Sequence, residues 1–269
     1  MKQLIVNADD FGLSNLVNKG ILHCFNHGIL SSTSLMANSE GFENATEIAK
    51  KFKLKVGVHL NLTTGKSLTK QSSLTGPNNS FLKHNIKMIL LRKINLNDVK
   101  NELKMQIERV NDYGLRPTHL DGHQHVHILP GVVNIIIELA KEFNIKKVRL
   151  PFQTQTFIRT SFKRRIIGLI INHYALKAKK CFQKNSLKFP EHFYGLYETG
   201  SLNTEKLKNF IINLNDGITE IMCHPGYHDP NLKLKLKSER VTELKALTSP
   251  IIKNLVKRHN IKLINFNKL

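Results

Sequence analysis

Two adjacent carboxylates, Asp9 and Asp10, follow a short apolar run at the start of the chain. Carboxylates this close together repel each other unless a positive charge lies nearby. Because successive side chains of an extended chain diverge, one carboxylate can bind a cation while the other takes a proton from water. Taken alone, the pair is explained more simply as a cap for the helix that Ser14 is expected to begin. Whether the pair has a catalytic or metal-binding role therefore depends on which residues lie near it.

Four histidines occur within ten residues, in the sequence THLDGHQHVH at 118–127. Imidazole and carboxylate groups together are a typical ligand set for Zn²⁺ and for several other divalent ions. A histidine-rich surface loop is the alternative explanation, and His119 is expected to lie on a strand facing the core. His59, in GVHLNL, would by itself be explained as a buried structural histidine. The histidines indicate a metal site only in combination with other motifs.

These residues are all expected near the ends of strands. Strands are predicted at residues 3–7, 31–37, 54–62, 117–121, 147–150, 218–223 and 261–265. Helices are predicted between them, at about 14–28, 40–53, 97–114, 131–143, 158–183, 204–215 and 238–247, with a last one beginning at 249–250. Strands that alternate with helices are typical of a parallel sheet. About seven strands in 269 residues favour a single α/β domain built as a distorted (β/α) barrel over an open sheet.

In parallel α/β folds the carboxyl ends of the strands converge on one face, where active sites are built. Four predicted strands would bring a set of polar side chains to that face: Asp9, Asp10, His59, Asn61, Asp121, His123, His125, His127 and His224. A metal bound there would polarise an acyl oxygen and lower the pKa of its bound water. A carboxylate would then act as base and a histidine as acid for a leaving amine. These groups predict amide hydrolysis, with a glycosidic or phosphoester bond as the alternative.

A covalent nucleophile is not indicated, because the chain has no G-x-S-x-G motif. Cys223 precedes His224, but adjacent side chains on a strand point apart, so Cys223 is assigned to the core. The three cysteines lie far apart with no C-x-x-C, which favours a reducing compartment. The first residues, MKQLIVNADD, lack the apolar run of a signal peptide, and no apolar stretch approaches the ~20 residues that span a bilayer. A cytoplasmic location is therefore predicted.

The chain carries 41 Lys and Arg residues against 20 Asp and Glu, a formal net charge of +21. Such a charge attracts anionic partners such as nucleic acid, an anionic membrane or a phosphorylated substrate. Solvated surface lysines are the simpler explanation for the chain as a whole. Aromatic residues make up 7% of the chain and tryptophan is absent, so the stacking platforms of nucleic-acid-binding proteins are not indicated. A specific nucleic-acid partner is therefore not expected.

Six segments of the chain resemble, in the same order, the YdjC-like family of carbohydrate deacetylases. They are IVNADDFGLS at 5–14, STSLMAN at 32–38, VGVHLNLT at 56–63, PTHLDGHQHVH at 117–127, VRLP at 148–151 and CHPGY at 223–227. The family includes chitooligosaccharide deacetylases and the hopanoid-biosynthesis-associated deacetylase. The resemblance implies a distorted barrel of the polysaccharide-deacetylase kind, a homodimer, and an enzyme that removes an acetyl group from an N-acetylated sugar.

The resemblance also implies roles for individual residues. One divalent metal ion, Mg²⁺ or Zn²⁺, would be bound by three side chains: Asp10, His59 and His123. Asp9 matches the general base, and His224 matches the acid for the leaving amine or a residue that orients the base. Contacts to the substrate or to the metal ligands are implied at the remaining motif positions: Asn61, Asp121, His125, His127 and Arg149. Arg149 would orient a carboxylate or bind substrate, and a salt bridge at a strand end is the alternative.

The chain departs from the family pattern at residues 157–184, where it carries an insertion rich in both basic and apolar residues. Its apolar residues recur at helical spacing: Ile158, Phe162, Ile166, Leu169 and Ile170. Its cations are Arg159, Lys163, Arg164, Arg165, Lys177, Lys179 and Lys180. One explanation is a helix that packs its apolar side on the core, and the other is a basic amphipathic helix on an anionic membrane. The second would place the protein on the membrane's cytoplasmic face and would suit a lipid-linked amino sugar.

Overall fold

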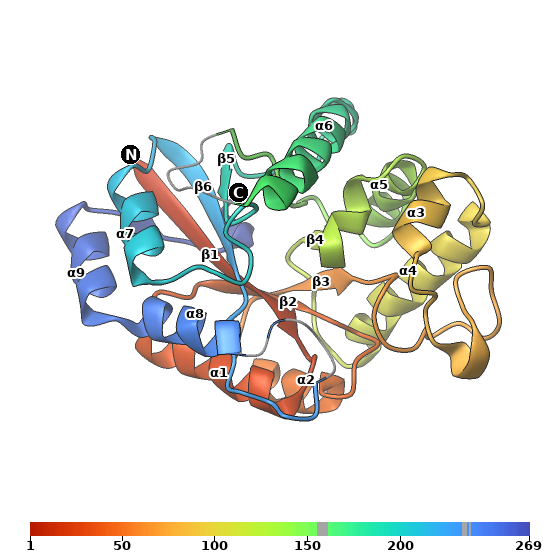
Figure 1. The fold of residues 1–269 in the computed structure, drawn as a ribbon, viewed down its shortest axis with the longest axis horizontal. Coiled ribbons are helices and arrows are strands. Elements are labelled where there is room, and N and C mark those ends of the chain that lie inside the picture. Colours follow the sequence, from red (N-terminus) through yellow and green to blue (C-terminus); the bar gives the residue numbers. More distant parts are fainter. Residues whose placement is uncertain (155–160, 233–235, 237) are drawn as a thin grey trace.

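A parallel sheet with β1 (Lys2–Phe11) at its centre organises the fold (Figure 1). The structure is a computed structural model that describes residues 1–154, 161–232, 236 and 238–269. The strand order is β4-β3-β2-β1-β6-β5, and β7 pairs with the first half of β1. The other strands are β2 (Ser32–Leu35), β3 (Val56–Leu60), β4 (Leu120–Gly122), β5 (His192–Tyr194), β6 (Gly217–Cys223) and β7 (Lys262–Leu263). Every strand pair in the described part of the chain is parallel.

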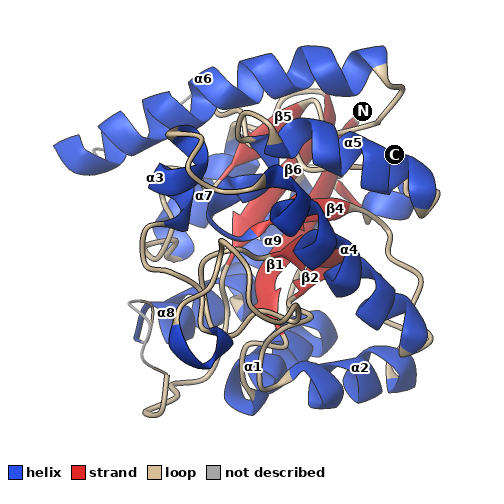
Figure 2. Cartoon of the chain, turned by 90° about the vertical axis from the view of Figure 1, so that its right-hand side faces the viewer, coloured by secondary structure: helices blue, strands red, loops and turns tan. Residues whose placement is uncertain are grey.

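Single parallel bridges extend the sheet beyond β4. Leu120 pairs with Val148, and Lys147 pairs in turn with Lys188, shortly before β5 begins. The sheet therefore curls into a half-barrel with helices around it, as Figures 1 and 2 show. The predicted distorted (β/α) barrel is confirmed.

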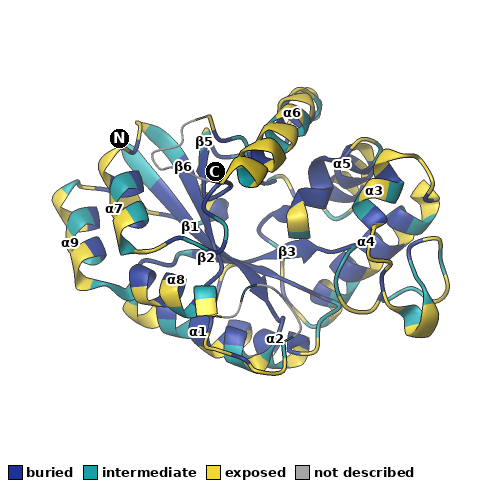
Figure 3. Ribbon diagram, in the orientation of Figure 1, coloured by how far each residue is buried: buried dark blue, intermediate teal, exposed yellow. Residues whose placement is uncertain are grey.

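The helices cover the outer side of the sheet, and most residues of its strands are buried, whereas both residues of β7 are exposed (Figure 3). The helices are α1 (Asn15–His27), α2 (Phe42–Lys51), α3 (Asn85–Leu90), α4 (Leu96–Asp112), α5 (Val132–Glu142), α6 (Phe162–Lys184), α7 (Thr204–Ile212), α8 (Ser238–Thr248) and α9 (Pro250–Arg258). Short 3-10 turns form η1 (Pro77–Asn79), η2 (His123–Ile128) and η3 (Phe266–Lys268). Ser14 caps α1 as predicted, because its Oγ accepts a hydrogen bond from the amide of Val17 at 3.3 Å.

Some predicted boundaries differ from the structure. The first strand continues to Phe11 instead of ending at residue 7, because its last residues pair with buried β2 across an irregular register. Asp9 and Asp10 therefore lie within β1. The strand predicted at 147–150 forms only the two bridges, and the short elements α3 and β5 were not predicted. Ile158 and Arg159 of the predicted insertion lie outside the described residues.

Candidate metal centre and active site

Asp10 reaches the centre of the site because of an unusual backbone conformation. Its φ of 64° lies in the left-handed region, which non-glycine residues enter at a cost. It falls where the pairing of β1 with β2 shifts register, between Ala8 and Phe11. Strain of this kind persists only where the surroundings hold it, and it is typical of functional sites.

Asp10, His59 and His123 come together as predicted, from β1, β3 and the start of η2. Oδ1 of Asp10 lies 3.5 Å from Nε2 of His59 and 3.1 Å from Nδ1 of His123. The three ligand atoms all lie within 4.8 Å of one another. Oδ1 is buried and lacks a hydrogen bond of good geometry among the described residues. One oxygen and two imidazole nitrogens facing a common point fit a divalent metal ion.

Asp121 supports His59 from the side opposite to the ligand atom. Nδ1 of His59 lies 3.0 Å from Oδ1 of Asp121, and Ser34 donates a hydrogen bond to Oδ2 at 2.8 Å. Burial lowers the pKa of His59, but the carboxylates of Asp121, Asp9 and Asp10 outweigh burial and raise that pKa to about 9. A carboxylate behind a metal-binding histidine fixes its ring orientation and strengthens it as a ligand.

Arg149 joins three buried carboxylates. It forms a two-pronged ion pair with Asp9, Nη1 to Oδ2 and Nη2 to Oδ1, both at 2.6 Å. Nη1 also lies 2.8 Å from Asp121, and Nε donates to Glu220 at 2.8 Å. Because Arg149 is fully buried, its partners fix the direction in which the carboxylate of Asp9 points. The arrangement is that of a residue that orients a carboxylate.

Keeping all three carboxylates charged around one guanidinium would cost free energy, because they are buried and their charges repel one another. Burial, together with Asp9 and Asp121, raises the pKa of Glu220 to about 7 despite its contact with Arg149. Glu220 is therefore the member of the cluster that most readily accepts a proton.

His224, at the end of β6, lies on the other side of Asp9. Its Nε2 is 4.0 Å from Oδ2 of Asp9, and its Nδ1 is 4.0 Å from Oε2 of Glu243. The backbone amide of His224 donates to the same Glu243 oxygen at 2.5 Å. Burial lowers the pKa of His224 to about 4, so its imidazole is neutral near pH 7 and one nitrogen faces Asp9.

Helix α8 supplies two site residues that were not predicted. Nη2 of Arg240 contacts Oδ2 of Asp10 at 2.5 Å, and Glu243, one turn further along, holds His224. In the sequence SERVTELK these two charges look like those of any surface helix, so no local signal distinguished them. Glu220 was also missed, although a glutamate inside the apolar strand ITEIMC is such a signal.

The remaining predicted residues lie around the centre. Nε2 of His127 is 3.1 Å from the carbonyl oxygen of Arg149, and His125 is buried with its ring in a T-shaped arrangement with that of Phe193. Asn61 instead holds the loop after β3, because its Oδ1 accepts from the amides of Thr63 and Thr64.

His119 faces the interior, as expected. Its ring stacks on Phe266 with centroids 3.6 Å apart, and burial lowers its pKa to about 3. Cys223 is buried in the core, also as predicted. His119 therefore supports the site from behind through its 3.2 Å contact with Ser34, and takes no part in the ligand cluster.

Comparison with known proteins places these motifs in one family. The sequence model described as "YdjC-like protein" matches residues 3–258. The chain is 35% identical to a carbohydrate deacetylase of Clostridium beijerinckii, over 99% of this chain and 100% of that protein. It is 34% identical to a chitooligosaccharide deacetylase of Yersinia pestis bv. Antiqua, over 98% of each.

A solved structure shares the whole fold. It is a protein of Enterococcus faecalis V583, provisionally described as a cellobiose-phosphate cleavage protein. The two chains superpose with a TM-score of 0.81 at 26% identity, over 99% of this chain and 98% of the other. The family model matches nearly the whole chain, and the half-barrel with its strand-end cluster is consistent with that match. The chain therefore belongs to the YdjC-like protein family.

Proposed function

We propose that this chain is a metal-dependent hydrolase that removes the acetyl group from an N-acetylated sugar. The observation that carries the proposal is the placement of Asp9 between a metal-binding cluster and His224, held there by Arg149. The deacetylase descriptions of the Clostridium and Yersinia relatives support the reaction and the substrate class.

Asp10, His59 and His123 would hold the metal ion. When bound, the ion would polarise the acyl oxygen and lower the pKa of water. We propose Zn²⁺ ahead of Mg²⁺, because two of the three donor atoms are imidazole nitrogens and Mg²⁺ prefers oxygen ligands.

Asp9 would act as the general base. Its ion pair with Arg149 fixes the direction of the carboxylate, so that Asp9 can accept a proton from the water that attacks the acetyl carbon. The C–N bond then breaks, acetate forms, and the leaving nitrogen needs a proton. His224 would deliver that proton. Its Nε2 lies 4.0 Å from Oδ2 of Asp9, so the proton that Asp9 takes up would reach the imidazole through one bridging water molecule. Glu243 would orient the ring of His224.

Acetate release tests this assignment. Protein loaded with Zn²⁺ should release one acetate per free amine from N-acetylglucosamine oligomers, and Asp9→Asn should lose most of that activity while still binding the ion. An unchanged rate in Asp9→Asn protein would rule out Asp9 as the base. His84→Gln, at an exposed histidine outside the site, is the matched control.

A second candidate follows from the Enterococcus relative, whose provisional description concerns cleavage of cellobiose phosphate. The same metal and base would then act on a glycosidic or phosphoester bond. Product analysis separates the two, because deacetylation leaves the sugar chain intact and releases acetate, whereas cleavage shortens the chain or releases phosphate. A nucleic-acid-binding function ranks last, since no observation in the described structure supports it.

We extend the proposal to the setting in which the enzyme works. The sequence predicts a cytoplasmic protein, the family resemblance implies a homodimer, and one explanation of the basic insertion suits a lipid-linked amino sugar as substrate. None of the described helices is long and apolar enough to cross a membrane. If the basic helix brings the site to a membrane, a lipid-linked N-acetyl sugar should be deacetylated faster than its free counterpart at equal concentration, and equal rates would contradict the lipid link.

A further inference from the structure

The side of α6 that faces away from the protein is apolar along most of its length. We name this side the outer face of α6 and define it by five exposed residues: Phe162, Ile166, Leu169, Ile170 and Leu176. Phe162 is 79% exposed and Leu169 is 64% exposed. At 3.6 residues per turn all five fall on one side of the helix. A stripe of this kind on a soluble surface marks an interaction site more often than a chance cluster.

The opposite side of α6 is fixed to the body of the protein. Its buried residues are Gly168, Ala175, Ala178 and Phe182. A Cβ on Gly168 would meet the ring of Tyr197, so the helix lies very close to that side chain. Asn172 donates to the carbonyl oxygen of Gln153 at 2.7 Å and to the hydroxyl of Tyr197 at 3.1 Å. The explanation in which the apolar stripe packs on the core is therefore wrong: the four buried residues pack inward, and Phe162, Ile166, Leu169 and Ile170 stay exposed.

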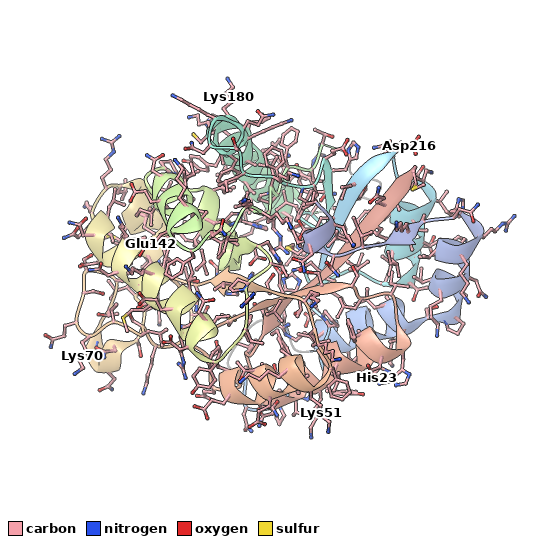
Figure 4. All side chains as sticks on the ribbon, turned by 180° about the vertical axis from the view of Figure 1, so that it is seen from behind. His23, Lys51, Lys70, Glu142, Lys180 and Asp216 are labelled. Carbon is pink, nitrogen blue, oxygen red and sulfur yellow. The ribbon has the colours of Figure 1, made fainter. Side chains whose placement is uncertain are left out.

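The outer face is bordered by positive charge alone. Within α6 there are seven cations and no carboxylate: Lys163, Arg164, Arg165, Lys177, Lys179, Lys180 and Lys184. Lys180 extends away from the protein at the outer edge of the molecule (Figure 4). Arg164 donates to Ser201, and no carboxylate pairs with the cations of α6 in the described structure. An occupant of this face must therefore offer apolar contact and negative charge together.

We propose that the outer face of α6 lies on an anionic lipid bilayer, with the helix axis parallel to the membrane plane. Apolar side chains between lysines and arginines are the pattern by which helices bind at the boundary between headgroups and acyl chains. Each cation near an anionic bilayer strengthens binding further. A helix of 23 residues is about 35 Å long, which gives the contact enough length to fix the orientation of the protein.

Charge argues against a second copy of the chain as the occupant. Two outer faces brought together would set the exposed cations of α6 against the same cations of the second copy, in a chain whose net charge is already +21. Repulsion of this kind keeps proteins apart, whereas a bilayer with acidic headgroups would remove it. α6 also contacts η2, which carries His123, so the bilayer would lie on the flank of the molecule next to the candidate site.

Vesicle binding tests the proposal directly. At low salt, the full-length protein should sediment with vesicles of phosphatidylcholine and phosphatidylglycerol, but not with vesicles of phosphatidylcholine alone. At high salt, it should sediment with neither kind of vesicle. The double variant Phe162→Ser, Leu169→Ser should bind at least about tenfold more weakly, and so should Lys177→Gln, Lys180→Gln. The matched control is Leu91→Ser, Ile251→Ser, which removes apolar side chains that are 52% and 58% exposed elsewhere on the protein.

A spectroscopic reading accompanies the binding assay. Because the chain has no tryptophan, Phe162→Trp gives a single reporter on the outer face, and its emission should shift to the blue on the anionic vesicles. Circular dichroism shows that each variant is folded. The proposal would be overturned if the wild-type protein did not bind anionic vesicles at low salt. A dimer that Phe162→Ser, Leu169→Ser breaks would also overturn it, since a second copy would then be the occupant.

Discussion

Arg240 and Asp10 form a buried ion pair in which Nη2 contacts only one carboxylate oxygen, Oδ2, and leaves Oδ1 directed at His59 and His123. The nearby cation is one reason that the pKa of Asp10 is held well below its usual value, against the opposing effect of burial. The pair thus compensates the charge of Asp10 and selects the oxygen that remains free for a metal ion.

Replacing Arg240 should make the stability of the protein depend on metal. In Arg240→Met the carboxylate of Asp10 stays buried without its cation, which should cost about 3–5 kcal/mol of unfolding free energy in the presence of a chelator. Saturating Zn²⁺ should restore part of this loss, because the ion neutralises the same carboxylate. Urea denaturation with chelator and with Zn²⁺ measures both. Arg258→Met, at an exposed arginine, should change neither value; an Arg240→Met protein as stable as wild type in chelator would contradict the account.

The three proposed metal ligands should each be needed to bind the same metal ion. Wild-type protein should bind one equivalent of Zn²⁺ in calorimetry, and Asp10→Asn, His59→Gln and His123→Gln should each weaken binding by at least about 100-fold. Asp121→Asn should weaken it less, by about 10-fold or more, since Asp121 contacts His59 and not the ion. Equal affinity in wild-type and His59→Gln protein would remove His59 from the site.

The Glu220 carboxyl should give the protein a specific pH dependence. Its pKa is raised from the usual 4.5 to about 7, so between these values the folded protein holds a proton that the unfolded chain releases. This contribution to stability is fully present below about pH 4.5 and is lost as pH rises through 7. Each pKa unit corresponds to about 1.4 kcal/mol, so the full effect is on the order of 3–4 kcal/mol.

The comparison with Glu220→Gln isolates this effect. Glutamine stays neutral at every pH, so the stability of wild type relative to Glu220→Gln should fall by roughly 2 kcal/mol between pH 5 and pH 7.5. Other titrating groups affect both proteins equally and cancel in the difference. A difference that stays constant over this range would show that Glu220 remains ionised in the folded protein.

The ring stack behind the site should limit what position 57 tolerates. A Cβ on Gly57 would lie 2.3 Å from the ring of His119, which is itself stacked on Phe266. Gly57→Ala should therefore cost about 1–3 kcal/mol of stability through overpacking. Gly76→Ala, where the nearest atom is 3.3 Å away, is the matched control and should cost less. Denaturation midpoints that do not distinguish the two variants would show that the ring moves freely.

The sequence was sufficient to predict which residues meet, because strand-end position in a parallel sheet is a strong geometric constraint. It identified Asp10, His59 and His123 from three separate segments, and the structure brings them together. It could not identify Arg240 and Glu243, because their role arises from how α8 packs across the end of β1 and β6. The charged residues of a helix do not by themselves indicate which tertiary contacts they will make.

The same limit explains why the sequence left two explanations of α6 open. Helical spacing predicted the amphipathic helix, but periodicity does not say which face meets the protein. Gly168 is decisive, because it allows a close approach to Tyr197 that a larger residue would prevent, and Ala175 and Ala178 are buried on the same side. β5 was missed for a related reason: three residues are too few to show a pattern, and only pairing with β6 defines them as a strand.

The most direct test of the central claim is acetate release from N-acetylglucosamine oligomers by the chelator-treated protein, measured before and after Zn²⁺ is added, in wild type and in Asp10→Asn. We expect no release before the ion is added, release with an intact sugar chain after it is added to wild type, and none from Asp10→Asn under either condition. Release that persists in chelator, or that Asp10→Asn retains in full, would contradict a metal-dependent deacetylase centred on Asp10, His59 and His123.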